Sequence, residues 1–369
     1  MKICMFSAGV PANVGGVESF IDELSNFLSR VGVDVTILGR SDRDFIVKDG
    51  NRRIIGIRLN DYLPKRLQFS HYHDYVYQLK IWRKIPNEHF DLIHGGNDNP
   101  FITLFFRRKE PLLVTFHGTL AGVYSRFACV NKLKPYQYFL STYAERVTAQ
   151  KCDIPIACSY TVKNELAMFY DINPNKIKVI YNGVNTDKFR IFDKTASRKK
   201  LGVPLKNKYA IWVGSDPNRK GLLIAIGAIR RLSGVKLLVV GVNGVSDEKV
   251  VYFGRVSEVM KLLIYNSTDF FIFPTLYEGF ALTPLEALAC GLPIIISKEC
   301  TTKEIIHEGV HGFVVNERKP ECYAEKIEVL LNDDKRYQEM SYNCRKLAEK
   351  YSWENQGKEY LKVYEKLVQ

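Results

Sequence analysis

The chain of 369 residues lacks any apolar run of about 18 residues, the length that a helix needs to cross a bilayer. It also lacks a C-x-x-C pair, and most of its eight cysteines stand in apolar stretches. This spacing disfavours a zinc site and predicts buried free thiols in a reducing compartment. Neither a Walker A sequence nor G-x-G-x-x-G occurs, so two common phosphate-binding loops are excluded. The opening MKICMFSAG carries one lysine and predicts a β-strand, with no signal peptide.

Acidic residues are too few to balance the basic ones, and the formal net charge is +13. Such a field favours an anionic partner, and much of the excess lies within residues 51–150. Nucleic acid, an anionic membrane and a phosphorylated ligand all fit this charge, as does a basic protein with no charged partner. A nucleic-acid-binding protein has no further support, because no helix-turn-helix, zinc-finger or RRM signature is present.

Short β-rich runs alternate with longer amphipathic stretches, and the alternation occurs twice along the chain. Many runs are continuous in Val, Ile, Leu and Phe, which is typical of strands buried on both faces of a parallel sheet. The pattern and the length predict two doubly wound α/β domains. The expected strands are residues 2–7, 33–39, 53–59, 91–95, 112–118 and 154–159, then 209–214, 235–241, 250–254, 269–275 and 292–297.

The joint between the two domains is expected within IKVIYNGVNTDKF, before a polar and basic stretch. This gives an N-terminal domain of residues 1–183 and a C-terminal domain of residues 184–350. The last stretch, residues 351–369, predicts an amphipathic helix. Its apolar stripe is formed by Tyr360, Leu361, Tyr364 and Leu367.

Glycines and cations follow two of the expected strands, at the sheet edge where open α/β proteins bind ligands. Gly15 and Gly16 open a helix, where missing Cβ atoms and free N–H groups suit a phosphate. Arg219 and Lys220 precede Gly221 and an apolar helix, where two cations oppose the helix dipole unless an anion joins them. A tight turn explains the first pair equally well, and two solvated charges explain the second.

A lone histidine, His117, follows another expected strand and precedes a glycine. A histidine at such a place is more often structural than functional. Its position on the ligand-binding edge of the sheet keeps a catalytic role open.

The stretch EGFALTPLEALACG, residues 278–291, follows the expected strand 269–275. Thr283 is expected to cap a helix and Pro284 to be its first residue, with the helix ending at Gly291. Glu286 then lies in the first turn, where the helix dipole alone accounts for an acidic residue. Glu278 lies in the loop, where the dipole gives no such explanation, so a binding role is favoured.

Taken together and in order, EGFALTPLEALACGLPII, YNGVNTDKF, NRKG, VGGVES and the helix after YSW resemble family 4 of the glycosyltransferases. The resemblance covers nearly the whole chain. It implies the GT-B fold: two Rossmann-like domains face each other across a cleft, and the C-terminal helix packs back on the N-terminal domain. It also implies retaining transfer of a sugar from a UDP-, GDP- or ADP-linked donor. The donor would bind mainly residues 184–350 and the acceptor mainly residues 1–183.

The resemblance also implies a role for each residue of the site. Glu286 would hold the ribose hydroxyls, Glu278 the donor sugar, and Lys220 with Arg219 the departing diphosphate. His117 would lie near the reacting sugar. The other implied donor contacts are Gly15, Gly16, Ser215, Phe280, Ala281, Leu282 and, at the base, the main chain of Val256.

The chain departs from the family pattern at two positions. Ser215 stands where many members carry arginine, which leaves Arg219 as a substitute. Ala281 replaces the second glycine of E-G-F-G, where its methyl group narrows the sugar pocket or changes little.

The implied mechanism is front-face attack, in which the leaving phosphate accepts the proton of the acceptor. A retaining glycosidase instead needs two carboxylates about 5–5.5 Å apart, and Glu278 and Glu286 do not suit that scheme. Stabilisation of the leaving group is expected to be electrostatic, with no metal or other cofactor. The D-x-D in SDRD, residues 41–44, is interpreted as a solvated turn. The alternatives are another GT-B enzyme, such as a nucleotide-sugar epimerase or a phosphorylase, and a nucleic-acid-binding protein.

Residues 61–84 and 101–139 interleave aromatic side chains with cations. Such segments suit peripheral binding to an anionic bilayer, although buried aromatics under a solvated basic face give the same pattern. We expect a cytoplasmic enzyme, at the membrane face, with a glycan or lipid-linked acceptor. Its product would belong to cell-surface glycan, glycolipid or glycoprotein biosynthesis, and no nucleic-acid partner is expected.

Overall fold

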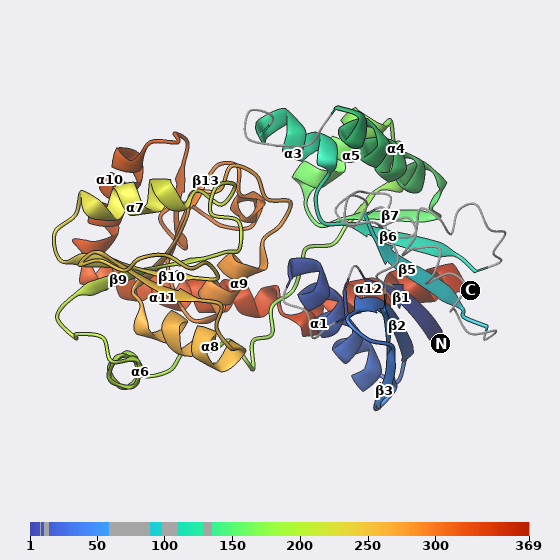
Figure 1. Cartoon of the computed structure of the whole chain (residues 1–369), viewed down its shortest axis with the longest axis horizontal. Coiled ribbons are helices and arrows are strands. Elements are labelled where there is room, and N and C mark those ends of the chain that lie inside the picture. The colour runs from blue at the N-terminus through green and yellow to red at the C-terminus, as the bar shows by residue number, and fades with distance from the viewer. Residues whose placement is uncertain (8, 11–14, 59–88, 98–109, 128–134, 369) are drawn as a thin grey trace. The chain divides into compact units, whose positions relative to one another are not determined.

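The computed structural model describes residues 1–7, 9–10, 15–58, 89–97, 110–127 and 135–368. The chain forms two compact units (Figure 1). The first unit comprises Met1–Asn182 together with Trp353–Gln369, and the second unit comprises Gly183–Ser352. Each contains a sheet with helices against it, so the expected pair of α/β domains is present.

The sheet of the first unit has, among the described residues, eight strands in the order β3-β4-β2-β1-β5-β6-β7-β8. All neighbouring strands are parallel except β3, which pairs antiparallel with β4 at the edge. The expected strands are present, and β3 and β8 are additional. The strands are β1 Lys2–Phe6, β2 Asp34–Ser41, β3 Phe45–Asp49, β4 Arg52–Arg58, β5 Leu92–Gly96, β6 Leu112–Phe116, β7 Ile154–Ala157 and β8 Lys178–Val179.

The C-terminal helix belongs to the first unit, where it packs against α1 and β5. Tyr360 and Tyr364 are fully buried in the same core as Phe20 and Phe27. Gly357 allows the close approach of the two helices, because an added Cβ would overlap the Phe27 ring. The helices of this unit are α1 Gly16–Arg30, α3 Leu120–Phe127, α4 Pro135–Lys151, α5 Tyr160–Tyr170 and α12 Trp353–Val368, with a 3₁₀ turn at Pro174–Lys176.

The sheet of the second unit has, in the part of the chain that the structure describes, six parallel strands in the order β11-β10-β9-β12-β13-β14. Figure 1 shows α7 and α10 together on one face and α8, α9 and α11 on the other. Only β14 is additional to the expected strands. The elements are β9 Lys208–Val213, β10 Val235–Val240, β11 Val250–Gly254, β12 Phe270–Phe273, β13 Ile294–Ser297, β14 Gly312–Val315, α6 Lys194–Leu201, α7 Leu222–Arg230, α8 Glu258–Ser267, α9 Leu282–Ala289, a 3₁₀ turn Thr301–Glu304, α10 Pro320–Leu331 and α11 Asp334–Lys350.

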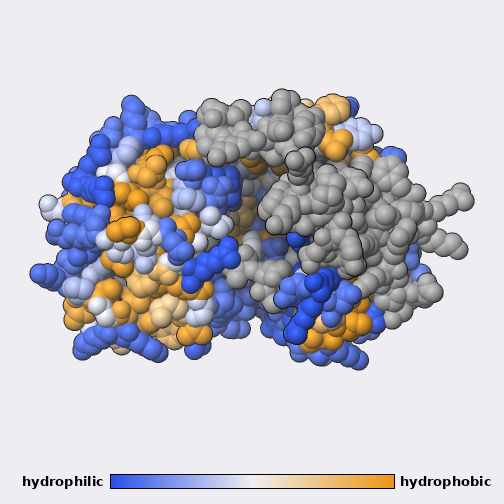
Figure 2. Space-filling model, in the orientation of Figure 1, coloured by the Kyte–Doolittle hydropathy of each residue, from blue (hydrophilic) through white to orange (hydrophobic). Residues whose placement is uncertain are grey.

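The surface of the second unit mixes hydrophobic and hydrophilic side chains (Figure 2). Leu223, Val245 and Val259 are among its exposed apolar residues. No helix in the described ranges is long and apolar enough to cross a membrane. Of the seven cysteines within those ranges, all except Cys322 are buried.

Candidate functional site

The loops that follow β9 and β12 are joined at one edge of the second sheet, because these two strands are neighbours. The backbone N–H of Leu276 donates to the carbonyl of Arg219 at 2.7 Å, and the Thr275 hydroxyl donates to the same oxygen at 3.2 Å. Gly221 has φ +68°, and an added Cβ there would overlap the carbonyl of Pro274. Glycine is therefore required where the two loops touch.

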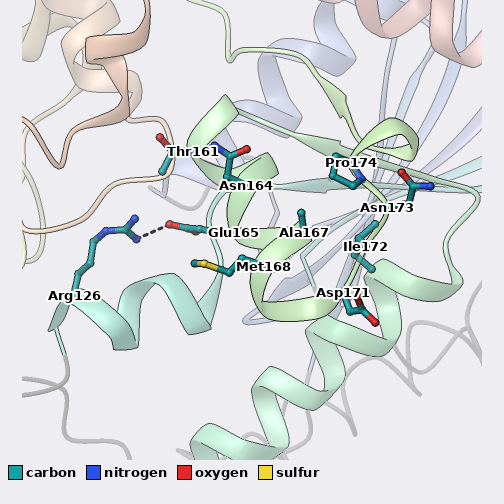
Figure 3. Close-up of a pocket in the computed structure, with 10 residues that line it drawn as sticks. All are labelled: Arg126, Thr161, Asn164, Glu165, Ala167, Met168, Asp171, Ile172, Asn173 and Pro174. Atoms are coloured by element: carbon teal, nitrogen blue, oxygen red, sulfur yellow. Dashed lines mark hydrogen bonds and ion pairs between the residues drawn. The ribbon is translucent and has the colours of Figure 1, made fainter.

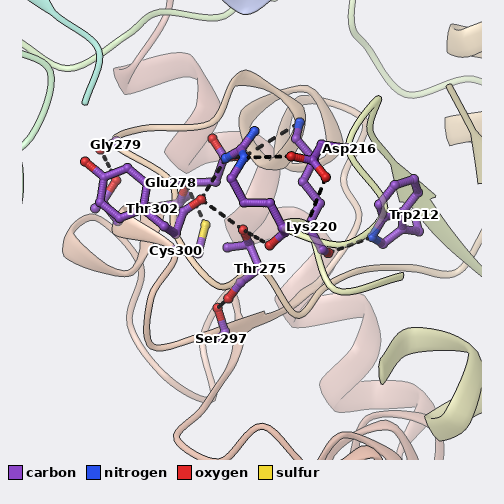
Figure 4. Close-up of polar contacts among 12 residues, drawn as sticks. Trp212, Asp216, Lys220, Thr275, Glu278, Gly279, Ser297, Cys300 and Thr302 are labelled. Carbon is purple, nitrogen blue, oxygen red and sulfur yellow. Dashed lines mark hydrogen bonds and ion pairs between the residues drawn. The ribbon is translucent and has the colours of Figure 1, made fainter. Parts of the chain in front are cut away.

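Two cations of the first loop converge on one carboxylate of the second (Figure 4). Arg219 Nη1 donates to Glu278 Oε1 at 2.7 Å and to the carbonyl of Tyr277 at 2.8 Å. Lys220 Nζ lies 3.7 Å from the same Glu278 oxygen. The three side chains that the sequence predicted for the sugar and the diphosphate thus form one cluster.

The cluster is only partly open to solvent, with 25% of the Arg219 side chain exposed, 15% of Lys220 and 14% of Glu278. Burial disfavours the charged guanidinium, but the carboxylates of Glu278 and Asp216 outweigh it and hold the pKa of Arg219 above its ordinary value. Lys220 Nζ lies 5.5 Å from the centre of the Phe273 ring. Two fixed positive charges in a sheltered place suit a diphosphate better than two solvated side chains do.

The loop that carries Glu278 is fixed from its other side as well. Glu278 forms an isolated parallel bridge with Cys300, and the hydroxyl of Thr301 donates to the carbonyl of Gly279. The Ser297 hydroxyl donates to the carbonyl of Thr275 at 2.6 Å. The loop is thus held in place by the segment that follows β13.

The start of α9 differs from the expected one. The helix begins at Leu282, with Ala281 as its N-cap residue, so the expectation that Thr283 caps it is wrong. Thr283 is the second helical residue, and its buried hydroxyl has no hydrogen-bond partner within the described part of the chain. Pro284 is the third residue rather than the first, which the helix tolerates because the N–H groups of its first turn have no intrahelical acceptor.

This shift matters for Glu286, which lies in the second turn of α9 and not in the first as expected. The dipole effect falls off within the first turn, so it no longer accounts for this carboxylate. Within the described structure, α7 and α9 begin without a side-chain cap, whereas α6 and α8 are capped by Asp193 and Ser257. The N–H groups of Leu222 and Ile224 at the start of α7 already donate to the carbonyls of Pro217 and Gly221, so the uncapped start of α9 is better suited to an anion.

Two side chains of α8 hold Glu286, and neither was singled out from the sequence. Lys261 Nζ lies 2.9 Å from Glu286 Oε1, and the Tyr265 hydroxyl donates to Glu286 Oε2 at 2.9 Å. Burial disfavours the charged ammonium, but Glu286 and Glu258 outweigh it and raise the pKa of Lys261. Burial first, then the charge of Glu286, raises the pKa of Tyr265 well above its ordinary value. Their spacing of four residues, which places both on one helix face, is the available sequence signal.

Except for Gly15 and Gly16, the other residues predicted for the donor lie at this end of the second unit. Val256 is half-buried in the turn between β11 and α8. Ser215 is exposed in the loop after β9. Phe280 and Ala281 are buried ahead of α9, and Leu282 is half-buried at its start.

His117 lies in the first unit, directly after β6. Its ring packs edge-on against Phe20, with 4.5 Å between ring centres. Burial lowers the pKa of His117 to about 4, so the imidazole is neutral near pH 7. Its buried Nε2 has no hydrogen-bond partner among the residues described. A neutral imidazole with one nitrogen left unpaired is suited to a hydrogen bond with a ligand hydroxyl.

A half-buried amide and a buried carboxylate hold the His117 loop, and both were missed from the sequence. Asn97 accepts the His117 N–H at 3.1 Å, and its amide nitrogen donates to the Gly118 carbonyl at 2.8 Å and to Glu145 at 2.9 Å. Glu145 also accepts the Leu120 N–H at 2.8 Å. Burial raises the pKa of Glu145. These partners fix the backbone on both sides of the histidine.

Gly15 is the N-cap residue of α1, and no side chain caps this helix in the described structure. An added Cβ on Gly15 would meet the carboxylate of Glu18, the end of a flexible side chain. An added Cβ on Gly16 would have no described atom within 4 Å. Packing within the described part of the chain therefore gives no reason for glycine at position 16.

Models of two related families match the chain, one on each part. Residues 14–188 match "Glycosyltransferase Family 4", and residues 193–347 match "Glycosyl transferases group 1". An uncharacterised glycosyltransferase of Methanocaldococcus jannaschii is 30% identical over 280 residues, which cover 69% of each chain. The chain belongs to glycosyltransferase family 4.

Solved structures place this glycosyltransferase in the GT-B fold. Sucrose-phosphate synthase from Thermosynechococcus elongatus superposes with a TM-score of 0.86 at 20% identity, over 99% of this chain and 98% of its own. The Anabaena protein HepE, in complex with UDP and glucose, gives a TM-score of 0.77 at 16% identity, over 99% and 100%. The predicted fold class is confirmed.

A pocket of about 700 Å³ in the first unit of the glycosyltransferase runs along α5 (Figure 3). Arg126 and Glu165 form an ion pair beside it, and the exposed Met168 lies on its wall. None of the residues predicted for the site is among the described residues that line it. Its charged lining consists of Arg126, Glu165 and Asp171, so it offers no excess of positive charge for a diphosphate.

Several predictions fall on parts of the glycosyltransferase that are not described. The basic aromatic segment 61–84 lies outside the described residues, as do residues 101–109 and 128–134 of the second such segment. The SDRD stretch is described: the Ser41 hydroxyl donates to Asp42 at 3.1 Å, and the Arg58 N–H donates to Asp44 at 2.7 Å. Over the ranges described, no group of three or more His, Cys, Asp or Glu side chains is placed to hold a metal ion.

Proposed function

We propose that this glycosyltransferase moves a sugar, with retention of configuration, from a nucleotide diphosphate sugar to a glycan or lipid-linked acceptor. The observation that carries the proposal is the convergence of Arg219 and Lys220 on Glu278, in the loop that leads to the uncapped start of α9. This arrangement supplies what a donor of this kind needs. Cations and N–H groups suit its diphosphate, and a carboxylate suits its sugar hydroxyls.

Each part of the donor has a counterpart in the second unit. The diphosphate lies against Lys220, with Arg219 in place of the arginine that Ser215 replaces. The donor sugar contacts Glu278, and the ribose contacts Glu286. The backbone N–H groups of Phe280, Ala281 and Leu282 lie along the sugar and the diphosphate, and the main chain of Val256 meets the base. Gly15 and Gly16 of the first unit approach the diphosphate. The complex of HepE with UDP and glucose supports a donor of this class.

The proposed catalysis is stabilisation of the leaving group. As the bond to the sugar breaks, negative charge develops on the diphosphate, and Lys220 and Arg219 stabilise it without rearranging. The acceptor hydroxyl attacks from the same face, and the leaving phosphate takes its proton. Glu278 and Glu286 are each paired with a cation, which disfavours either as a nucleophile. The scheme needs no metal or other cofactor, and His117, neutral near pH 7, hydrogen-bonds the reacting sugar.

The acceptor is proposed to be a glycan or a lipid-linked sugar on the cytoplasmic side of a membrane, in the assembly of cell-surface glycans, glycolipids or glycoproteins. The net charge of +13 and the basic aromatic composition of residues 61–84 support contact with anionic lipid. Flotation with vesicles that contain anionic lipid tests this part alone. Absence of binding at low salt would remove it and leave the donor chemistry untouched.

The decisive experiment is a thermal-shift panel of UDP-, GDP- and ADP-sugars, followed by product analysis. Donor binding stabilises the folded state by about 2.7 kcal/mol at 100 times Kd. We expect one nucleotide class to raise Tm and a sugar to be transferred to an acceptor. A free epimer as the product would favour an epimerase, and a free sugar phosphate would favour a phosphorylase. The absence of any shift would contradict the proposal.

A further inference from the structure

Glu286 is held at both of its oxygens by side chains of α8. Lys261 Nζ lies 2.9 Å from Oε1, and the Tyr265 hydroxyl donates to Oε2 at 2.9 Å. We propose that Lys261 and Tyr265 are positioning residues that orient this carboxylate toward the ribose diol, so that the site selects ribonucleotides over deoxyribonucleotides. This inference rests on the proposed function, in which Glu286 contacts the ribose.

The geometry of a carboxylate explains why hydrogen-bond partners on both of its oxygens are needed to orient it. The terminal torsion of a glutamate is broad, so an unrestrained carboxylate rotates easily. A vicinal diol needs two acceptors at a fixed spacing and direction. Each carboxylate oxygen can accept about two hydrogen bonds, so one contact on each oxygen leaves one more for a ligand hydroxyl. One contact on each oxygen of Glu286 fixes its rotation without saturating it.

Lys261 is itself held from several directions, as a positioning residue must be. Its ammonium lies 3.0 Å from Glu258 and 5.1 Å from the centre of the buried Phe189 ring. Glu258 is in turn paired with Lys188. Only 16% of the Lys261 side chain is exposed and 12% of Glu286. The pair is therefore sheltered, and its attraction is screened less than that of a surface pair.

Lys261 also changes the charge that the donor meets. A lone Glu286 carboxylate would repel an incoming diphosphate, whereas the Lys261–Glu286 pair is neutral. Loss of Lys261 should therefore weaken nucleotide binding in two ways, by releasing the carboxylate and by exposing its charge. Loss of the Tyr265 hydroxyl should act by the first way alone, because phenylalanine changes no charge.

A purely structural alternative is that these contacts only join α8 to α9. The Tyr265 hydroxyl also lies 3.3 Å from the carbonyl of Thr283, which fits that alternative. The two explanations differ in what the 2′-hydroxyl contributes. If the contacts only join the two helices, their loss changes the affinity for all nucleotides alike. If they position Glu286, their loss weakens the binding only of ligands that carry the 2′-hydroxyl.

The test is a double-mutant cycle that combines protein variants with ligands that have or lack the 2′-hydroxyl, with each Kd measured by isothermal titration calorimetry. The probes are the nucleoside diphosphate that binds best among UDP, GDP and ADP, and its 2′-deoxy form. The proteins are the full chain and its Lys261→Met and Tyr265→Phe variants. We expect the parent to prefer the ribonucleotide roughly 10- to 100-fold, as for hydrogen bonds to a charged group. Tyr265→Phe should lose most of that preference with the 2′-deoxy form bound almost as before.

Lys326→Met is the matched control, because Lys326 also pairs with a glutamate, Glu308 at 3.3 Å, and lies 5.2 Å from the Phe313 ring centre. It should leave both affinities unchanged. If folded Lys261→Met and Tyr265→Phe proteins keep the full preference, or if the parent has none, the inference is overturned and the proposed function stands. If the parent binds no nucleoside diphosphate, the proposed function falls and the inference with it. Circular dichroism and Tm show whether each variant is folded.

Discussion

Replacing Glu278 with glutamine should tighten the binding of a nucleoside diphosphate and impair sugar transfer. Glu278 accepts from Arg219 at 2.7 Å and lies 3.7 Å from Lys220, so its carboxylate occupies the cations that the diphosphate is proposed to use. Glutamine keeps the shape and removes the charge. The diphosphate then meets two cations without a competing anion, while the donor sugar loses its carboxylate contact.

The size of the effect follows from the geometry. Two unit charges 3.7 Å apart, like Lys220 and Glu278, attract by about 4 kcal/mol at an effective dielectric constant near 20. Solvent reaches the cluster, and the glutamine dipole retains part of the attraction, so the net change is smaller. We expect about 1.4 kcal/mol, which is roughly a tenfold tighter Kd for the nucleoside diphosphate. The preference for the nucleotide sugar over the nucleoside diphosphate should fall by a similar factor.

Calorimetry with UDP, GDP and ADP, each with and without its sugar, measures both quantities, and product formation measures transfer. Glu308→Gln is the control, because Glu308 pairs with Lys326 on another part of the second unit. A folded Glu278→Gln protein that binds the nucleoside diphosphate more weakly would refute the reasoning. It would mean that the carboxylate organises the cations and does not compete for them. An unchanged preference for the sugar would refute the sugar contact.

Three further predictions follow from the same structure. Lys220→Ala should lower turnover at saturating nucleotide sugar by at least about 100-fold, which is the usual effect of removing one group that stabilises the charge developing in the transition state. Product formation at a normal rate would exclude this role of Lys220. Gly16→Ala should leave the Tm of the free protein unchanged, because the added Cβ meets no described atom. The same variant should reduce the Tm shift that a bound nucleotide causes. An equal shift in the parent and the variant would show that no ligand approaches this position. Burial lowers the pKa of His94 to about 3 and of His117 to about 4, below their ordinary 6.5, so the unfolded chain binds more protons in this window. Stability should hold above pH 6.5 and fall as pH decreases toward 4, and equal urea midpoints at pH 7 and pH 5 would contradict this.

The strands of both sheets were largely predictable because most are buried on both faces. Two of the three missed strands are exceptions: β3 is an exposed edge strand and β8 has only two residues, whereas β14 is mostly buried and lies at the edge of the second sheet. An edge strand that faces solvent has no continuous apolar run to reveal it.

The cluster of Arg219, Lys220 and Glu278 was predictable although 59 positions separate Arg219 from Glu278. The C-terminal ends of neighbouring parallel strands share an edge, and this rule brings their loops together. No comparable rule links Lys261 to Glu286 or Asn97 to Glu145, because these contacts depend on how one helix packs beside another element. The start of α9 was misplaced because Thr283 fits a cap by residue type, while the helix begins at Leu282, two residues before the expected Pro284.

The placement of α12 in the first unit has a consequence for the order of synthesis. A ribosome makes residues 1–182, then all of the second unit, and only afterwards the helix that covers Phe20 and His94. The second unit is one uninterrupted segment, so all of its residues are made before α12. While those 170 residues are synthesised, part of the core of the first unit stays uncovered. During that interval the nascent chain presents the apolar face that α12, Trp353–Val368, later covers.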